Sequence, residues 1–337
     1  MTIAILTINQ PSLTAAERLL PVLHEHTVTI YGKAGLEHTM NDLHVYDKLD
    51  DILPDAWQTY DAIIAILAMG AVVRKIAPLL QDKATDPAIL VMNLALDRVV
   101  PLLSGHLGGA NALAETIAAR LPGCLNFLST ATDQTGTLAF EMLARERGWT
   151  IENLPALARI SNRLINHQLV RVATLPGIFE SIEKRDNLIR VDWEMIDENT
   201  VVIAPHIHSQ AFTLRPPVYL GIGCNRGTSE AEIAEAFEMF LSRYGLNREQ
   251  IASIASFEAK RDEEGLLAFA GAYNLPIAFY DPEAINALEG EFSPSASTRF
   301  FGIKGVAEPS AILASTYREL LFPKEVYLNK ITIAGAL

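Results

Sequence analysis

Short, nearly continuous apolar runs alternate with amphipathic segments through the first 150 residues of the chain. The runs typical of buried strands lie at 3–8, 27–31, 62–67, 89–94 and 99–103. Apolar residues recur with helical spacing at 14–24, 72–80, 110–121 and 136–147. This alternation predicts a parallel sheet covered by helices on both faces. Ligands of such sheets bind beyond the carboxyl ends of the strands, so the loops after the strands are the first places to look for a site.

The pattern changes between residues 151 and 213. Short strand-like runs at 169–174, 188–191 and 201–204 are separated by polar, charge-rich turns, and the helical periodicity fades after Ile165. We expect a small α+β middle domain here. The tripeptide Arg215-Pro216-Pro217 then predicts a stiff, extended junction, because proline fixes the backbone φ angle.

The alternation of strand and helix patterns restarts at Val218. Strands are expected at 218–222, 251–255, 276–279 and 330–334, and helices at 230–244, 262–273 and 307–317. The sequence therefore predicts an α/β fold with two Rossmann-like α/β/α units, each with a mostly parallel sheet, joined by the small α+β middle domain. The expected domain ranges are 1–150, 151–215 and 216–337.

The charge balance narrows the class of partner. The 337 residues include 27 Lys+Arg against 40 Asp+Glu, a net charge of −13, which disfavours non-specific binding to nucleic acid or to an anionic membrane. The two cysteines cannot form a disulfide framework. The N-terminus lacks the layout of a signal peptide, and the longest apolar run, 62–73, is too short to cross a bilayer. We expect a cytoplasmic protein with neither a nucleic-acid nor a membrane partner.

The densest group of site-like residues follows the strand expected at 99–103. The segment 104–111 reads SGHLGGAN, and its glycines 105, 108 and 109 allow a backbone to approach a ligand closely. A helix that begins here would present unpaired N–H groups and the positive end of its dipole. Ser104, His106 and Asn111 add polar side chains to the same turn. The alternative interpretation is a tight turn whose glycines serve packing and whose histidine caps a nearby group.

A second glycine-rich turn follows the strand expected at 218–222. Gly221, Gly223 and Gly227 resemble a dinucleotide fingerprint, but their spacing is one residue too wide and no acidic residue follows about 20 positions later. The turn predicts instead an anion-binding helix N-terminus beside Arg226, with Thr228 in the same turn. Its Cys224, like Cys124, is of a residue type that is most often small, apolar and buried.

Three further loops hold weaker candidates for ligand contact. These are Gly70, Arg74 and Lys75; Thr132 and Asp133; and Lys260 with Asp262 and Glu263. Each loop also has a structural interpretation, as a solvated helix face or a helix N-cap. A metal site is not expected: His206 and His208 would share one face of a strand, but no third ligand stands at motif spacing.

Taken together, these blocks resemble the cobalt-precorrin-5A hydrolase (CbiG) family of anaerobic cobalamin biosynthesis. The blocks are Asp86-Pro87-Ala88, LSGHLGGAN at 103–111, TATD at 130–133, GIGCNRGTS at 221–229, Lys260 with Glu263 and Leu266, VAEPSA at 306–311, and Lys324. They follow the family's order nearly from end to end. Three positions depart from the family pattern: Asn93 replaces an acidic residue, Ser129 a threonine and Glu264 a proline.

The resemblance implies a reaction on an anionic cobalt tetrapyrrole. Water opens a δ-lactone, and the methylated C20 carbon leaves as acetaldehyde to give cobalt-precorrin-5B. Cobalt arrives within the substrate, so the resemblance implies no cofactor and no protein-bound metal. A homodimer and transient hand-over contacts with neighbouring pathway enzymes stay open.

The resemblance also suggests roles for the candidate residues. Arg74, Lys75, Arg226 and Lys260 would bind substrate carboxylates, and the glycines would lie against the flat macrocycle in a cleft between domains. His106 is the expected general base, since its ordinary pKa lies near neutrality, and the N–H groups around Gly108 and Gly109 would hold the oxyanion. Glu263, Glu308 or Asp133 would assist carbon–carbon cleavage as acid or base.

Two rival functions remain open at this stage. A non-catalytic tetrapyrrole carrier is the stronger rival, because the C-terminal part alone resembles a stand-alone protein of the aerobic cobalamin pathway. The SGHLGGAN segment, which this chain retains, favours the hydrolase. A nucleotide-sugar or dinucleotide enzyme is the weaker rival, given the wrong glycine spacing and the missing ribose-binding acid.

Overall fold

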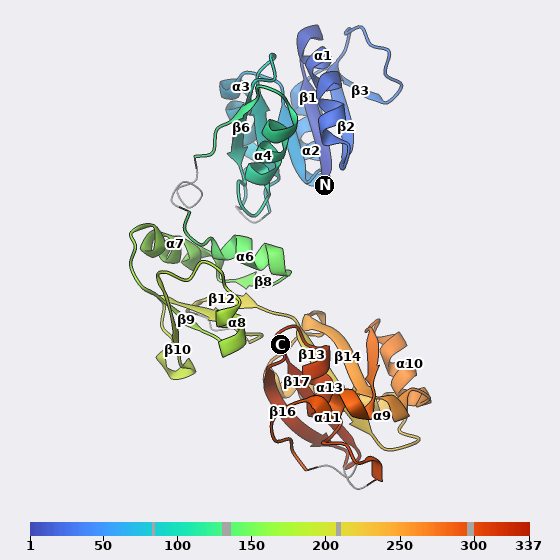
Figure 1. Cartoon of the computed structure of the whole chain (residues 1–337). Coiled ribbons are helices and arrows are strands. Elements are labelled where there is room, and N and C mark those ends of the chain that lie inside the picture. The colour runs from blue at the N-terminus through green and yellow to red at the C-terminus, as the bar shows by residue number, and fades with distance from the viewer. Residues whose placement is uncertain (83–84, 130–135, 207–209, 295–299) are drawn as a thin grey trace. The chain divides into compact units, whose positions relative to one another are not determined.

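The computed structural model describes residues 1–82, 85–129, 136–206, 210–294 and 300–337 (Figure 1). The chain divides into two compact units, Met1–Gly136 and Thr137–Leu337. The second unit contains two sheets, which correspond to the expected middle and C-terminal domains. Helix α6 (Phe140–Arg147), which the domain range 1–150 assigned to the first domain, therefore lies in the second unit.

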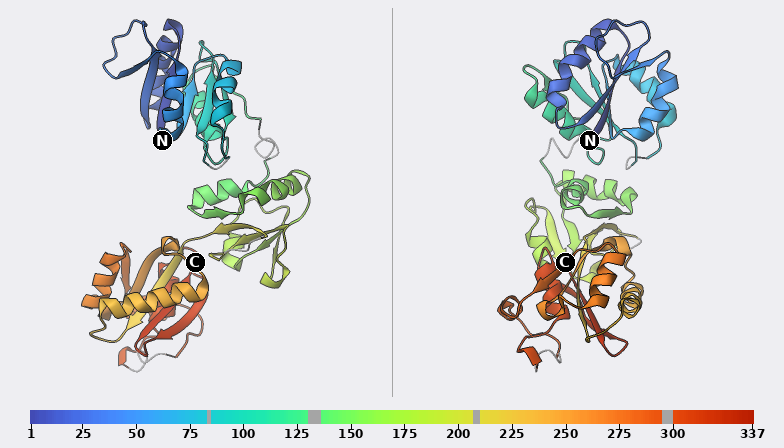
Figure 2. Two further views of the ribbon diagram at one scale, coloured as in Figure 1. Left: turned by 180° about the vertical axis from the view of Figure 1, so that it is seen from behind. Right: turned by 90° about the vertical axis from the view of Figure 1, so that its right-hand side faces the viewer.

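The first unit contains a seven-stranded sheet of order β3-β2-β1-β4-β5-β6-β7. Its strands are β1 (Thr2–Thr7), β2 (Thr27–Lys33), β3 (Leu43–Tyr46), β4 (Ala62–Ala65), β5 (Ala88–Met92), β6 (Arg98–Leu103) and β7 (Leu125–Asn126). Its helices are α1 (Gln10–Leu19), α2 (Leu49–Thr59), α3 (Met69–Ile76) and α4 (Ala110–Arg120). Two apolar cores, one on each face of the sheet, confirm the expected helical layers on both sides (Figure 2, right).

Strand β6 reverses the direction of this sheet. Strands β1 to β5 run parallel, whereas β6 pairs antiparallel with β5 in a register that sets Ile89 opposite Leu103. The two strands are joined by residues 93–97 only, and a parallel pair needs a crossover of a dozen residues or more. The carboxyl end of β6 consequently lies at the edge of the sheet where the parallel strands begin.

The middle sheet has five strands in the order β10-β9-β11-β12-β8. These are β8 (Thr150–Glu152), β9 (Val170–Ala173), β10 (Leu188–Val191), β11 (Thr200–Ile203) and β12 (Phe212–Arg215), and only β8 runs antiparallel to its neighbour. Helices α6, α7 (Leu157–Ile165) and α8 (Pro176–Glu180) accompany them. The expected strands at 169–174, 188–191 and 201–204 are all confirmed.

The C-terminal sheet has the order β15-β14-β13-β17-β16. Its strands are β13 (Val218–Cys224), β14 (Ile251–Phe257), β15 (Ile277–Tyr280), β16 (Leu320–Tyr327) and β17 (Ile331–Ala336). Its helices are α9 (Glu230–Tyr244), α10 (Glu264–Ala272), α11 (Pro282–Ala287) and α13 (Ala307–Ala314). Strands β13, β14 and β15 are parallel, and β17 pairs antiparallel with both β13 and β16. The expected α/β architecture is confirmed, although β16 was not anticipated.

The middle and C-terminal sheets share one continuous apolar core. Between them, the Arg215 side chain is 5% exposed and binds both domains. Its Nε donates to the Pro205 carbonyl at 2.7 Å, one terminal nitrogen lies 3.2 Å from Glu152 Oε1, and the other donates to Gln250. The expected stiff junction at 215–217 is thus held by a buried, fully partnered guanidinium as well as by its prolines.

Candidate functional site

The SGHLGGAN segment forms a compact turn between β6 and α4. Ser104 takes a left-handed backbone with φ of 55°, and its hydroxyl donates to the carbonyl of Asp86 at 2.8 Å. The side chains of His106 and Asn111 are buried within the first unit, at 5% and 8% exposure. Three polar side chains that the sequence singled out therefore lie together in one turn.

The backbone N–H groups of this turn are largely used internally. Gly109 N–H donates to the His106 carbonyl at 3.1 Å, Ala110 N–H to Ser104 at 3.2 Å, and Asn111 N–H to Gly105 at 2.9 Å. The prediction of unpaired N–H groups at the start of α4 is therefore wrong for these positions. Because the Gly109 N–H already donates to the His106 carbonyl, it is not available as an oxyanion donor in this conformation.

The glycines of the turn allow it to fold against itself. A β-carbon on Gly105 would lie 2.7 Å from Asn111 Oδ1, and one on Gly108 would lie 2.4 Å from the β-carbon of Ser104. Gly109 adopts a left-handed φ of 85° as the N-cap of α4. Close packing of the turn itself accounts for Gly105 and Gly108.

The candidate cations of the first unit lie at the other edge of its sheet. Helix α3, which carries Gly70, Arg74 and Lys75, follows the carboxyl end of β4, whereas Ser104 lies beside Asp86 at the amino end of β5. Arg74 donates to the carbonyl of Gly70 at 3.0 Å, and Lys75 lies 2.6 Å from Asp50. The expectation that these residues and the glycine-rich turn share one edge is wrong, because β6 reverses direction. Thr132 and Asp133 lie outside the described residues.

A second polar cluster forms where β13 and β14 end. Glu263 is 4% exposed, and its Oε1 accepts the Gly227 N–H at 2.5 Å while its Oε2 lies 3.2 Å from Lys260 Nζ. Arg226 reaches the same carboxylate at 3.6 Å and pairs with Asp262 at 2.6 Å. The hydrogen bond from Arg226 lowers the pKa of the Asp262 carboxyl. The structure thus brings the K-x-x-E segment and the second glycine-rich turn together.

Cys224 ends strand β13 beside this cluster. Burial raises the pKa of its thiol, and the nearby positive charge of Lys260 opposes that shift without cancelling it. A thiol with a raised pKa is protonated near neutrality, and the thiol form is a poor nucleophile. Cys224 therefore fits a lining role in the site.

The glycines at the end of β13 fill different needs. A β-carbon on Gly221 would lie 1.8 Å from the Ala307 carbonyl oxygen in α13, and one on Gly223 would lie 2.6 Å from Thr332 Oγ1. Helix α13 and strand β17 therefore occupy the space that a flat ligand was expected to use at these positions. Gly227 has a left-handed φ of 72° with open space around it. The neighbouring Thr228 hydroxyl is buried and donates to Asn225 at 2.8 Å.

Glu308, at the start of α13, is also a buried carboxylate. It accepts the Ser293 N–H at 2.7 Å, the Ser293 hydroxyl at 2.8 Å and the Lys324 N–H at 3.0 Å. Burial alone would raise the pKa of this carboxyl, but the three hydrogen bonds outweigh burial and lower it. Glu308 consequently ties the segment at 293 to strand β16 as an ionised group.

Several polar anchors had no signal of their own in the sequence. Asp86, buried with its carboxylate accepting the Gln81 N–H at 3.1 and 3.2 Å, stands beside the SGHLGGAN turn. Asp86-Pro87-Ala88 appeared among the family-like blocks, and this could have marked it. Ser293 is recognisable only from its partners in space, whereas Asp262 stands in the loop with Lys260 and Glu263 that the sequence already singled out.

The part of the chain that the structure describes contains neither a metal-ligand cluster nor a membrane-spanning helix. No group of three or more His, Cys, Asp or Glu side chains there is arranged to hold a metal ion. The ring of His206 lies 5.9 Å from that of Trp193, and His208 is outside the described residues. No helix in the described segments has the length and apolar character needed to span a membrane.

Three family models match consecutive parts of the chain. They are the cobalamin synthesis G N-terminal model at 51–133, the cobalamin biosynthesis central region at 138–218 and the cobalamin synthesis G C-terminus at 218–336. A cobalt-precorrin-5A hydrolase from Priestia megaterium is 29% identical, covering 99% of this chain and 94% of its own. One from Salmonella typhimurium is 32% identical, covering 77% and 78%. The crystal structure of a putative cobalamin biosynthesis protein G homolog from Sulfolobus solfataricus covers 99% and 96% at 22% identity, with a TM-score of 0.40.

Proposed function

Because this chain belongs to the cobalamin synthesis G family, we propose that it is a cobalt-precorrin-5A hydrolase of cobalamin biosynthesis, acting in the cytoplasm. The observation that carries the proposal is a relative of that activity, 32% identical over 77% of this chain. The three family models in unbroken order support it across the middle and C-terminal regions as well.

The proposed reaction consumes one water for each acetaldehyde released. Water attacks the carbonyl carbon of the δ-lactone, the acyl carbon–oxygen bond breaks, and the former ring oxygen stays on C20 as a hydroxyl. Cleavage of the carbon–carbon bond between C20 and the macrocycle then leaves the electron pair on the macrocycle and releases C20, its methyl group and that oxygen as acetaldehyde. The product is cobalt-precorrin-5B. Cobalt belongs to the substrate, so the proposal requires no resident metal and no organic cofactor.

We assign the residues of the first unit to the chemistry of water attack. His106 is the proposed general base, supported by its place among Ser104, Asn111 and the Asp86 carbonyl in one buried turn. General-base assistance of this kind contributes about 10²–10⁴-fold in rate. Asp133 stays a candidate acid for the departing fragment.

We assign the cluster at the ends of β13 and β14 to substrate binding. Arg226 has an exposed side chain, and Lys260 is charged and partly buried, so both can meet substrate carboxylates by charge-assisted hydrogen bonds. Glu263 and Glu308 were candidates for acid–base roles, but their carboxylates already accept several donors. We therefore assign both glutamates to holding the binding loops in position rather than to proton transfer.

The test is acetaldehyde release from cobalt-precorrin-5A, read through NADH oxidation by alcohol dehydrogenase, with the purified chain as the only added catalyst. We expect one acetaldehyde per substrate over many turnovers. Reactions without the protein, and with the protein but without the lactone, provide the baseline. Tight binding of the substrate with no acetaldehyde would replace the hydrolase with a carrier role.

A further inference from the structure

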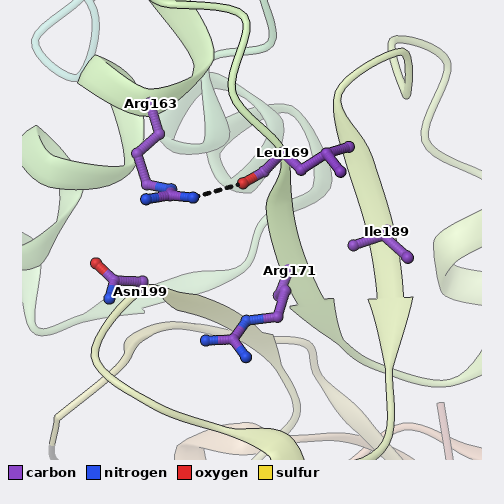
Figure 3. A pocket seen from close by; sticks show the side chains of 5 residues that line it. All are labelled: Arg163, Leu169, Arg171, Ile189 and Asn199. Atoms are coloured by element: carbon purple, nitrogen blue, oxygen red, sulfur yellow. Dashed lines mark hydrogen bonds between the residues drawn. The ribbon is translucent and has the colours of Figure 1, made fainter.

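The middle domain contains a pocket that no role assigned above uses. It has a volume of about 350 Å³ and lies where strands β9, β10 and β11 begin (Figure 3). Its lining residues are Arg163, Leu169, Arg171, Ile189 and Asn199. Two of the five are arginines and none is acidic, so the pocket lining is positively charged although the chain as a whole has a net charge of −13.

Arg171 is held in place on strand β9. One of its terminal nitrogens pairs with Asp197 Oδ2, and the Asp197 carboxylate also accepts the Thr200 hydroxyl at 2.8 Å and the Asn199 N–H at 2.9 Å. Burial alone would raise the pKa of Asp197, but these hydrogen bonds outweigh it and lower the pKa. An ionised Asp197 therefore fixes one end of the guanidinium, and the group as a whole points into the pocket (Figure 3).

Arg163 enters the pocket from helix α7. One terminal nitrogen donates to the Leu169 carbonyl at 3.0 Å, while its Nε is buried without a hydrogen-bond partner among the described residues. A buried donor without an acceptor is unfavourable, so this guanidinium is incompletely satisfied by the protein's own acceptors. Figure 3 shows the side chains of Arg163, Arg171 and Asn199 around the same pocket. Of the two cations, Arg171 has the Asp197 carboxylate as a partner, whereas Arg163 donates to a carbonyl, so an added anion would complete the balance.

The wall of the pocket beside the arginines is apolar. Leu169 and Ile189 are 59% and 48% exposed, although both are large aliphatic residues. Leu169 directly precedes strand β9, and Ile189 lies on the neighbouring parallel strand β10, where it pairs in register with Arg171. A ligand that suits this pocket carries an anionic group for the arginines and an apolar body for the two aliphatic side chains.

We propose that the Arg163–Arg171 pocket is a carboxylate-binding subsite for a peripheral acid side chain of the tetrapyrrole substrate. The identity of this ligand rests on the function proposed above, whose substrate is a largely apolar ring with acetate and propionate arms. Guanidinium groups match carboxylates by paired N–H···O bonds, and the aliphatic wall packs against the arm or the ring edge. The subsite positions the substrate and takes no part in bond cleavage.

The test compares two probes on the full chain: a cobalt corrinoid whose peripheral arms are free carboxylates, and the same corrinoid with those arms amidated. We expect the carboxylate form to bind more tightly. Arg163→Gln and Arg171→Gln should each weaken its binding about tenfold, the loss expected for one charge-assisted hydrogen bond, and leave the amidated form unaffected. Arg159→Gln is the matched control, since Arg159 lies one turn earlier on α7 and pairs with Glu198 outside the pocket.

A second measurement avoids the question of whether the variants fold. The unmodified chain is treated with phenylglyoxal, which reacts with arginine, and each arginine is followed by mass spectrometry. The carboxylate corrinoid should protect Arg163 and Arg171 and leave Arg159 reactive. Equal labelling with and without the probe would overturn the subsite.

The outcomes separate the subsite from the hydrolase. If acetaldehyde is never released but the carboxylate corrinoid still protects both arginines, the hydrolase fails and the subsite stands. If acetaldehyde is released and Arg163→Gln and Arg171→Gln bind the carboxylate corrinoid as the parent chain does, the subsite fails and the hydrolase stands.

Discussion

Glu263 shows how a single buried carboxylate organises the end of strand β13. Its two oxygens accept from the backbone of Gly227 and from Lys260, two residues 33 positions apart in the chain. Glu308 is engaged in the same way by Ser293 and Lys324. Both carboxylates therefore hold loops of the C-terminal sheet in place, which supports the positioning role proposed for them. His106 stays the group proposed for proton transfer.

Replacing His106 tests the assignment of the general base. We expect His106→Gln to lower the turnover number by about 10²–10⁴-fold, because the amide cannot take up a proton from water. The Michaelis constant should change far less, since the contacts proposed for the substrate carboxylates lie at other residues. The measurement is acetaldehyde release at saturating substrate together with direct binding of the substrate.

His24→Gln is the matched control for that variant, because His24 is an exposed histidine of the same unit. It should retain the parental rate. Parental turnover in the His106 variant would remove this residue from the chemistry, and a loss of the folded circular dichroism signal would show that the turn, rather than the proton, had been lost.

The ionisation of Glu232 makes the free energy of unfolding depend on pH. A hydrogen bond from Lys330, followed by those from the Ser229 N–H and hydroxyl, lowers the pKa of Glu232 from an ordinary value of 4.5 to about 2. The contribution is complete above pH 4.5 and is lost as the pH falls towards 2, because the unfolded chain binds this proton first. The melting temperature of the parent should therefore fall more steeply across this window than that of Glu232→Gln.

Glu235→Gln provides the comparison for the acid melting series, since Glu235 is exposed on the same helix. Its melting curve should follow the parent at every pH. Parallel curves for the parent and Glu232→Gln between pH 4.5 and 2 would mean that the Lys330 pair does not survive in solution.

At the scale of elements, the close crossing of α13 over β13 depends on one glycine. A β-carbon on Gly221 would fall 1.8 Å from the Ala307 carbonyl and 2.6 Å from the Ala311 N–H, both of which belong to the backbone of α13. We expect Gly221→Ala to destabilise the second unit by about 1–3 kcal/mol or more, since a helix must move to accept the methyl group. Urea unfolding followed by circular dichroism measures the difference.

Gly271→Ala is the control for Gly221→Ala, and its expected effect on stability has the opposite sign. Gly271 lies in α10, and a methyl group added at this position would meet nothing within 4 Å, so Gly271→Ala should stabilise the chain by about 0.5–1 kcal/mol through helix propensity. If both alanine variants unfolded at the same urea concentration, the close approach of α13 to Gly221 would be incorrect.

The elements themselves were largely predictable, but their directions were not. Apolar periodicity placed helix 230–244 at its observed limits and found nearly all the strands of the first sheet. It missed β16 because Pro323, Lys324 and Glu325 interrupt the apolar pattern of that strand. The short link at 93–97 indicates an antiparallel β6, because a parallel pair needs a longer crossover, and this direction places the turn at 104–111 at the edge of the sheet where the parallel strands begin. Partners of buried side chains, such as Gly227 for Glu263, depend on tertiary packing and have no local pattern.

At the scale of the whole molecule, the apolar cores decide which parts of the chain can fold independently. The first unit has its own apolar cores on the two faces of its sheet, whereas the middle and C-terminal sheets share one large core beside smaller clusters of their own. Polar contacts reinforce that sharing, since Arg147 donates to Tyr317 at 3.1 Å and Glu319 accepts the Gly177 N–H at 3.0 Å. The chain thus divides into two compact units, and the second holds both the expected middle domain and the expected C-terminal domain.

Fragments of the chain test this division. We expect 1–136 and 137–337 each to unfold cooperatively when expressed alone, because each keeps an intact core. A fragment 137–215 should lack a cooperative transition, because it ends within the shared core and leaves Arg215 without Gln250. Urea titrations followed by tryptophan fluorescence and by circular dichroism provide two probes whose midpoints must coincide. A cooperative transition in 137–215 with coincident midpoints would show that the middle sheet is a domain in its own right and that the shared core contributes little to its stability.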